Sequence, residues 1–171
     1  MPRAISGNSL SDESLLDFVQ EQFHQHNVPP ERFCFEITET AAILHLTRAQ
    51  RFAREIRKLG GRIALDDFGS GFSSFRYLKN LPVNYLKIEG GFVRDMLENP
   101  SDRVMVTAIN QMGHTLGIQT IAEHVSDAAI ADSLRALGVD YAQGYSMGRP
   151  LPLAEAWGER ADPGSESRVV K

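Results

Sequence analysis

Asp66-Asp67-Phe68-Gly69-Ser70-Gly71-Phe72-Ser73-Ser74 is the stretch that decides how this chain is interpreted, and it follows the apolar run Arg62-Ile63-Ala64-Leu65. Neighbouring residues on a strand point to opposite faces, so both carboxylates can serve one site only if the chain turns sharply there. The glycines permit such a turn. Two carboxylates held close together repel each other unless a cation neutralises them. The segment therefore indicates a divalent-metal site, while an aspartate before a Gly-Ser turn is equally typical of a helix N-cap.

Polar residues also end the other apolar runs of the chain. The residues at these ends are Glu36, Asp66 with Asp67, Lys87, Glu123 and Gln143, and successive members are 20 to 36 residues apart. Each interval is about the length of one strand-plus-helix unit. Polar side chains at the C-terminal ends of parallel strands form the active-site rim of a β/α barrel. The spacing therefore predicts one shared site rather than five unrelated polar residues.

Helical patterns fill the intervals between these runs. We expect N-caps at Ser11, Thr47 and Ser101, and we expect Gly117 and Gly138 to end two of the helices. Alternation of strands and helices favours a parallel α/β sheet or barrel. The fold class predicted is an α/β, incomplete (β/α)8 TIM-type barrel with about five strands and intervening helices, plus a strand stub around Ala4-Ile5.

The length of the chain limits how much of the barrel it can build. A complete barrel needs about 250 residues, so a chain of 171 residues is roughly 80 residues short. We expect residues 1–157 to form the partial domain and residues 158–171 to form a flexible polar tail. An open barrel exposes strand edges and apolar core. We therefore expect a homo-oligomer, or a complement from the missing part of the barrel.

The composition of the chain argues against a nucleic-acid partner, an internal disulfide and a membrane span. The net charge of −4 provides no basic surface suited to long nucleic acid. Cys34 is the only cysteine, so no internal disulfide forms and a cytoplasmic location is expected. No apolar run approaches 18 residues, so the sequence predicts no membrane span.

These features together resemble the C-terminal part of an EAL domain, the cyclic-di-GMP phosphodiesterase family of bacterial signalling proteins. The resemblance covers about residues 4–153 in order and spacing. The segments that carry it are Phe35-Glu36-Ile37-Thr38-Glu39-Thr40, Leu65-Asp66-Asp67-Phe68-Gly69-Ser70-Gly71, Leu81-Pro82-Val83-Asn84-Tyr85-Leu86-Lys87-Ile88, Thr120-Ile121-Ala122-Glu123, Tyr141-Ala142-Gln143-Gly144-Tyr145 and Gly148-Arg149-Pro150.

The resemblance implies a role for each matching residue. Glu36, Asp66 and Asp67 are the implied ligands of two Mg²⁺ or Mn²⁺ ions, and oxygen ligands suit such hard cations. Two cations can clamp the attacking and leaving oxygens of a phosphodiester. The implied reaction is metal-dependent hydrolysis of cyclic-di-GMP to linear pGpG.

The remaining implied roles concern catalysis and substrate. Lys87 holds and helps to activate the attacking water, and Glu123 is a further acidic member of the site. Glu39 steadies the loop after the aspartate pair, a loop that is also a dimer contact in the family. Gln143 lies in the active-site cleft. We add Arg76, with Lys79 nearby, as an expected cationic contact for the dinucleotide.

Several positions depart from the family pattern. The Glu-Ala-Leu segment is absent, and Ala4 stands where the family has a metal-binding asparagine. Ser126 replaces a second glutamate, His124 replaces a common glycine and Glu89 replaces the usual aspartate. We interpret Ser126 as a helix cap and His124 as a structural residue rather than a metal ligand. Because lost ligands weaken both metal affinity and geometry, we expect this chain alone to hydrolyse cyclic-di-GMP very slowly or not at all.

Three functions therefore stay open at this point. The first is a phosphodiesterase domain represented by its C-terminal part. The second is a degenerate domain that binds cyclic-di-GMP without hydrolysing it. The third is a protein-interaction or dimerisation module.

Overall fold

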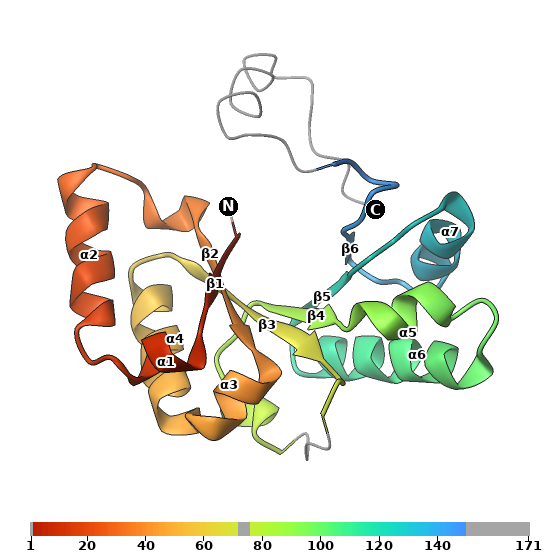
Figure 1. Ribbon diagram of the computed structural model, residues 1–171, viewed down its shortest axis with the longest axis horizontal. Helices are drawn as coiled ribbons and strands as arrows, with labels where there is room; N and C mark the ends of the chain where they lie inside the picture. The colour runs from red at the N-terminus through yellow and green to blue at the C-terminus, as the bar shows by residue number, and fades with distance from the viewer. Residues whose placement is uncertain (1, 72–75, 150–171) are drawn as a thin grey trace.

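The computed structural model describes residues 2–71 and 76–149, and these residues build a parallel sheet with helices outside it (Figure 1). The sheet has six strands in the order in which they occur along the chain. The strands are β1 (Pro2–Ile5), β2 (Cys34–Thr38), β3 (Arg62–Phe68), β4 (Tyr85–Ile88), β5 (Gln119–Ala122) and β6 (Tyr141–Ala142). All five pairings between neighbours are parallel.

Helices follow the strands and return the chain to the start of the next one. They are α1 (Gly7–Ser11), α2 (Leu15–Gln25), α3 (Glu39–Leu44), α4 (Leu46–Lys58), α5 (Gly90–Asp95), α6 (Pro100–Thr115) and α7 (Ala128–Ala136), with the short 3-10 helices η1 (Pro30–Arg32) and η2 (Leu78–Asn80). Figure 1 shows α1 to α4 grouped at one end of the sheet and α5 to α7 at the other.

This arrangement confirms the predicted incomplete β/α barrel. Within the described residues, β1 pairs only with β2 and β6 pairs only with β5, so the sheet does not close on itself. The expected stub around Ala4-Ile5 forms part of β1. The expected flexible tail, residues 158–171, lies outside the described residues.

The core lies on both faces of the sheet. Ile63, Ala64 and Leu65 are consecutive in β3 and all are buried, which is typical of a parallel strand covered on both sides. On the outside, α4 contributes Phe52 and Ile56 to this core. These helices position the strands and leave the C-terminal strand ends accessible to polar side chains.

The expected helix caps are wrong at Ser11, Thr47 and Ser101. Ser11 ends α1, and α4 already begins at Leu46, one residue before Thr47. The N-cap of α6 is Asn99, whose side chain accepts a hydrogen bond from the Ser101 backbone N–H at 3.0 Å. Pro100 is the physical reason, because proline is favoured at the first helical position and requires the cap directly before it.

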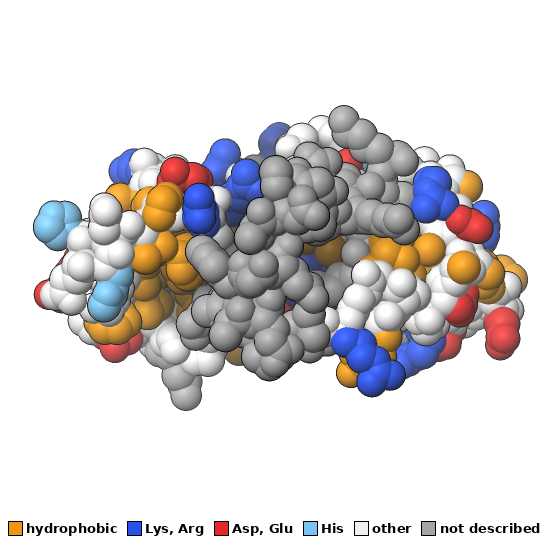
Figure 2. Space-filling view, turned by 90° about the horizontal axis from the view of Figure 1, so that it is seen from above, with side chains coloured by type: hydrophobic (Ala, Val, Ile, Leu, Met, Phe, Trp, Pro, Cys, Tyr) orange, Lys and Arg blue, Asp and Glu red, His pale blue; other side chains and the backbone are white. Residues whose placement is uncertain are grey.

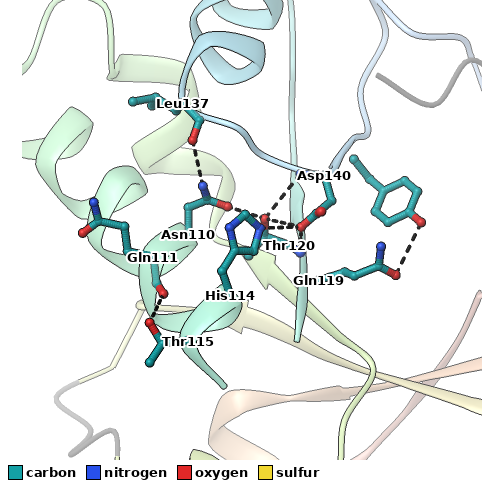
Figure 3. A network of polar contacts seen from close by, with 9 residues as sticks. Asn110, Gln111, His114, Thr115, Gln119, Thr120, Leu137 and Asp140 are labelled. Atoms are coloured by element: carbon teal, nitrogen blue, oxygen red, sulfur yellow. Dashed lines mark hydrogen bonds and ion pairs between the residues drawn. The ribbon is translucent and has the colours of Figure 1, made fainter. Parts of the chain in front are cut away.

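A polar network ties α6 to the N-terminal ends of β5 and β6 (Figure 3). Asn110 is 3% exposed and donates to the Leu137 carbonyl at 2.9 Å. The Thr120 hydroxyl donates to the Asn110 side-chain oxygen at 2.6 Å. Asp140 accepts from the Thr120 backbone N–H at 2.8 Å and contacts His114 Nε2 at 2.8 Å. The network lies at the end of the sheet opposite the acidic residues that follow the strands.

None of the helices in the described ranges is long and apolar enough to cross a membrane.

The first prediction concerns Asn110→Ala. The change leaves the Leu137 carbonyl without its side-chain donor and removes one of the two acceptors of the Thr120 hydroxyl, which keeps only Asp140 at 3.2 Å. We therefore expect the free energy of unfolding to fall by about 2 kcal/mol. Urea unfolding followed by circular dichroism measures this loss. Gln111→Ala is the matched control, because Gln111 is exposed on the same helix and its change should stay within about 0.5 kcal/mol. Equal losses for both variants would contradict the structural role of the network.

Candidate metal and active site at the strand ends

Lys87 of β4 is the centre of the candidate site. Its Nζ lies 3.0 Å from Glu36 Oε1 of β2, 2.7 Å from Asp66 Oδ1 of β3 and 2.8 Å from Glu123 Oε1 after β5. The lysine side chain is only 4% exposed. Four successive strands therefore deliver one ammonium and three carboxylates to the same edge of the sheet, as the spacing along the sequence predicts.

A local irregularity in β3 brings the second aspartate to the same place. The pairing between β3 and β4 shifts its register between Leu65 and Phe68. Asp67 lies in this interval with φ of 54°, a left-handed conformation that aspartate tolerates better than most residues. As a result, Asp66, Asp67 and Glu123 each offer a carboxylate oxygen, and these oxygens all lie within 4.8 Å of one another.

The electrostatics of the site favour an added cation. Burial raises the pKa of the Glu123 carboxyl, and the neighbouring Lys87 acts against this rise. Burial also raises the pKa of Asp67, and the Asp66 carboxylate raises it further. Burial is the largest cause of both shifts, and repulsion between neighbouring carboxylates adds to it.

Lys87 itself stays charged at this position. Burial alone would lower the pKa of Lys87, but the hydrogen bonds to Asp66 and Glu123 outweigh it and raise the pKa above its ordinary value. One ammonium nevertheless faces the carboxylates of Glu36, Asp66, Asp67 and Glu123. Clustered carboxylate oxygens with excess negative charge are the donor set that Mg²⁺ and Mn²⁺ prefer, so the residues present fit such a cation.

Glu39 is not part of the carboxylate cluster but stabilises the chain next to it. It begins α3, is 2% exposed, and accepts hydrogen bonds from the Gly69 backbone N–H at 3.0 Å and from the Tyr77 hydroxyl at 2.8 Å. Burial and the hydrogen bond to Glu39 both raise the pKa of Tyr77. Glu39 therefore fixes the chain directly after the aspartate pair. Phe72, Ser73 and Ser74 of the predicted loop lie outside the described residues.

Gly69 is required for this arrangement. It has φ of +102°, and a Cβ at this position would lie 2.8 Å from the Phe92 ring and 3.2 Å from Ile109. A side chain there would be both strained and crowded. The predicted turn after the aspartates is thus held by Glu39 and permitted by Gly69.

The two predicted substrate contacts lie in different places. Gln143 is exposed directly after β6, and its backbone bonds to Ala122 and Val125 place it beside the chain that carries Glu123. Arg76 is exposed and lines a hollow with Lys79, with Met112 and Thr115 of α6 and with Leu116, the C-cap of that helix. The structure therefore brings Gln143 to the strand-end side and does not bring Arg76 to the carboxylate cluster.

The sequence signals missed two supporting residues. Tyr77 reaches Glu39 across 38 residues of sequence, and no local pattern marks such a contact. Gly90, the first residue of α5, lies against the Nδ1 edge of the His124 ring. His124 is not part of the group formed by Asp66, Asp67 and Glu123.

The family departures also have defined positions. The β1 register places Ala4 opposite Glu36, and alanine has no side-chain oxygen to offer a metal. Ser126 does not itself cap α7. Its hydroxyl donates to Asp127 at 3.1 Å, and Asp127 caps the helix by accepting from the Ile130 backbone N–H at 3.0 Å.

Comparison with known proteins gives a consistent result. The chain matches the family model of the EAL domain over residues 4–150. The protein PdeB of Shewanella oneidensis, named a cyclic di-GMP phosphodiesterase, is 46% identical over 150 residues, which cover 88% of this chain and 18% of PdeB. PdeF of Escherichia coli, also named a cyclic di-GMP phosphodiesterase, is 33% identical over 141 residues, which cover 82% of this chain and 19% of PdeF. The chain thus spans about a fifth of the length of these curated relatives.

Solved structures agree with the sequence relatives. The PaMucR phosphodiesterase in complex with c-di-GMP superposes with a TM-score of 0.86 at 32% identity, covering 91% of this chain and 63% of that chain.

The second prediction concerns Lys87→Met. Removal of the ammonium leaves the carboxylates of Glu36, Asp66 and Glu123 uncompensated, so in EDTA we expect the free energy of unfolding to fall by about 3 kcal/mol. Because a divalent cation can replace the lost positive charge, Mg²⁺ should stabilise this variant more than the unchanged chain.

Lys58→Met is the matched control for this experiment. Lys58 pairs with Glu55 at 2.8 Å but is 69% exposed, and such surface pairs contribute about 0–1 kcal/mol. Chemical denaturation with and without Mg²⁺ measures both variants. If Lys87→Met lowers the free energy of unfolding no more than Lys58→Met does, the ion pairs of Lys87 do not stabilise the fold and the prediction is wrong.

Proposed function

The chain belongs to the EAL domain family, and we propose on that basis that its strand-end cluster is the cation-binding and cyclic-di-GMP-binding part of a phosphodiesterase site. The observation that carries the proposal is the group formed by Lys87 with Glu36, Asp66 and Glu123, beside Asp67. The family reaction is the metal-dependent hydrolysis of cyclic-di-GMP to pGpG. The PaMucR structure, which contains c-di-GMP, supports the choice of ligand.

In this proposal Glu36, Asp66, Asp67 and Glu123 hold Mg²⁺ or Mn²⁺. When bound, the cation neutralises phosphate charge and lowers the pKa of a coordinated water. Lys87 orients the attacking water with an ammonium that its carboxylate partners already fix in place. Glu39 acts at a distance, because its hydrogen bond to Gly69 fixes the chain that leaves Asp67. Gln143 faces the dinucleotide from the chain after β6.

We propose that the chain alone binds cyclic-di-GMP but turns it over very slowly or not at all. Position 4, which the β1 register places opposite Glu36, has no side-chain oxygen, and position 126 carries a hydroxyl that bonds to Asp127. The loss of ligands at positions 4 and 126 weakens cation binding and distorts the geometry of the site in this proposal. The same observation favours the second candidate function, a receptor that binds cyclic-di-GMP without hydrolysis.

The third prediction is a binding measurement. Calorimetric titration with cyclic-di-GMP in the presence of Ca²⁺, which supports binding without turnover in this proposal, should show saturable binding near one ligand per chain. Asp67→Asn should weaken this binding by about tenfold or more, because it removes a carboxylate from the cluster. Asp132→Asn, an exposed change on α7, should leave binding unaltered.

The outcomes separate the candidate functions. Binding without product formation in Mn²⁺ supports the receptor, and slow formation of pGpG supports a weakened phosphodiesterase. Hydrolysis at the rate of an intact domain would show that Ala4 and Ser126 do not limit the site. No heat from demonstrably folded protein would contradict the proposed ligand and leave the assembly module as the leading function.

We also propose that the open side of the barrel is covered by a second copy of this chain. An apolar groove of about 470 Å³ lies between α2 and the ends of β1 and β2 that carry Ile5 and Phe35, and Figure 2 shows hydrophobic side chains exposed at this end of the molecule. Its lining includes Ile5, Phe18, Val19, Phe23, Phe33 and Phe35. Ile5 belongs to β1, whose other edge has no strand partner among the described residues. Ile5 thus links the groove to the strand with the unpaired edge, which favours a self-complementary interface there.

The fourth prediction tests this interface. Phe18 is 57% exposed at the groove, so Phe18→Glu should shift the chain from an oligomer to a monomer in multi-angle light scattering at micromolar concentration. Val104→Glu is the control, because Val104 is 64% exposed on α6 and does not line the groove. A monodisperse monomer for the unchanged chain would contradict the proposed self-association.

A further inference from the structure

Gly90 has a special environment at the start of α5. It is buried, and a Cβ built on it would lie 1.7 Å from His124 Nδ1 and 2.6 Å from His124 Cγ. Gly90 does not adopt a positive φ, so its backbone conformation alone does not require glycine. Glycine is needed here because the imidazole of His124 occupies the place that a side chain would take.

His124 has an equally unusual backbone. Its φ is +54°, in the left-handed region that non-glycine residues seldom adopt and that carries a free-energy cost. His124 is exposed to solvent, so burial of apolar area does not account for its position. The structure packs its ring against Gly90.

The two residues lie next to the charged centre of the candidate site. His124 directly follows Glu123, and Gly90 lies three residues after Lys87, while Glu123 and Lys87 form an ion pair of 2.8 Å. On the other side of His124, the buried Val125 donates its backbone N–H to the Gln143 carbonyl at 3.0 Å. His124 therefore lies between Glu123, which is fixed by its ion pair, and Val125, which is fixed by its backbone hydrogen bond. Its ring connects the chain after β5 to the start of α5.

We propose that His124 is a positioning residue whose imidazole interlocks with Gly90 and so holds the Glu123 carboxylate in place beside Lys87. The interlock joins the chain after β5 to the chain after β4, the two segments that supply this pair. Its consequence for cation binding rests on the proposed function of the cluster. His124 itself contacts neither the cation nor the substrate in this proposal.

The fifth prediction is a cycle of four proteins: the unchanged chain, Gly90→Ala, His124→Gly and the double variant. In EDTA, Gly90→Ala should lower the urea midpoint of the unchanged chain, because the added Cβ collides with the ring. In the His124→Gly background the same alanine should have little effect, because the ring is absent. An equal effect in both backgrounds overturns the interlock. If Gly90→Ala alone fails to fold, folding of the double variant supports the interlock and its failure overturns it.

The affinity for Mn²⁺ separates a positioning role from a purely structural one. Calorimetric titration of His124→Gly should give about tenfold weaker Mn²⁺ binding, as expected when a metal ligand loses its support. His124→Asn should behave similarly, since asparagine tolerates the left-handed backbone but lacks the imidazole. Unchanged Mn²⁺ affinity in both variants overturns the positioning role. If the unchanged chain binds no Mn²⁺, the proposed function fails, while the urea midpoints still decide the interlock.

Discussion

The arrangement of the candidate site depends on one buried ammonium. Lys87 contacts three carboxylates from three other segments, and this is possible only if β2, β3, β4 and β5 are parallel and in register. Burial of so many ionisable groups is costly unless they are paired closely. The pairing constrains the strand ends more tightly than hydrophobic packing would, because packing tolerates small shifts that a 2.7 Å contact does not. The ion pairs at the C-terminal strand ends therefore also fix the register of the sheet.

The irregularity in β3 resolves a conflict between sheet geometry and site chemistry. A regular strand would direct Asp66 and Asp67 to opposite faces. The register shift after Leu65 and the left-handed backbone of Asp67 bring both carboxylates to one side. Such a conformation persists only when its surroundings hold it. Glu39 fixes this conformation by accepting a hydrogen bond from the Gly69 backbone N–H, two residues after Asp67. The buried Glu39 carboxylate therefore has a structural role although it is not part of the carboxylate cluster.

The sequence predicted the part of the site that depends on periodicity. Glu36, Asp66, Lys87 and Glu123 each follow an apolar run at the interval of one strand-plus-helix unit, so their convergence follows from the parallel fold. The fold class was predictable for the same reason. Contacts set by tertiary packing were not predictable, because the bond from Tyr77 to Glu39 and the place of His124 over Gly90 depend on how separate loops meet.

Local competition explains the remaining differences. Ser101 is a good cap residue in isolation, yet Asn99 takes the position because Pro100 fixes where α6 begins. Arg76 follows the aspartate-pair segment in sequence, and charge alone suggested a ligand contact. Its exposed place beside the C-terminal end of α6 reflects the path of the chain toward η2, which no composition or spacing argument encodes.

Two separate deficits meet on the same strand. The paired carboxylates come from the interior of the sheet, where every strand has two neighbours, whereas β1 has one neighbour among the described residues. The register of β1 also sets Ala4, a residue type without a side-chain oxygen, opposite Glu36. In the proposed self-association, a second copy that pairs with the free edge of β1 would lie beside Ala4 and beside Ile5 of the apolar groove. One contact would then affect both the unpaired sheet edge and the surroundings of Glu36, which is why the two proposals are linked.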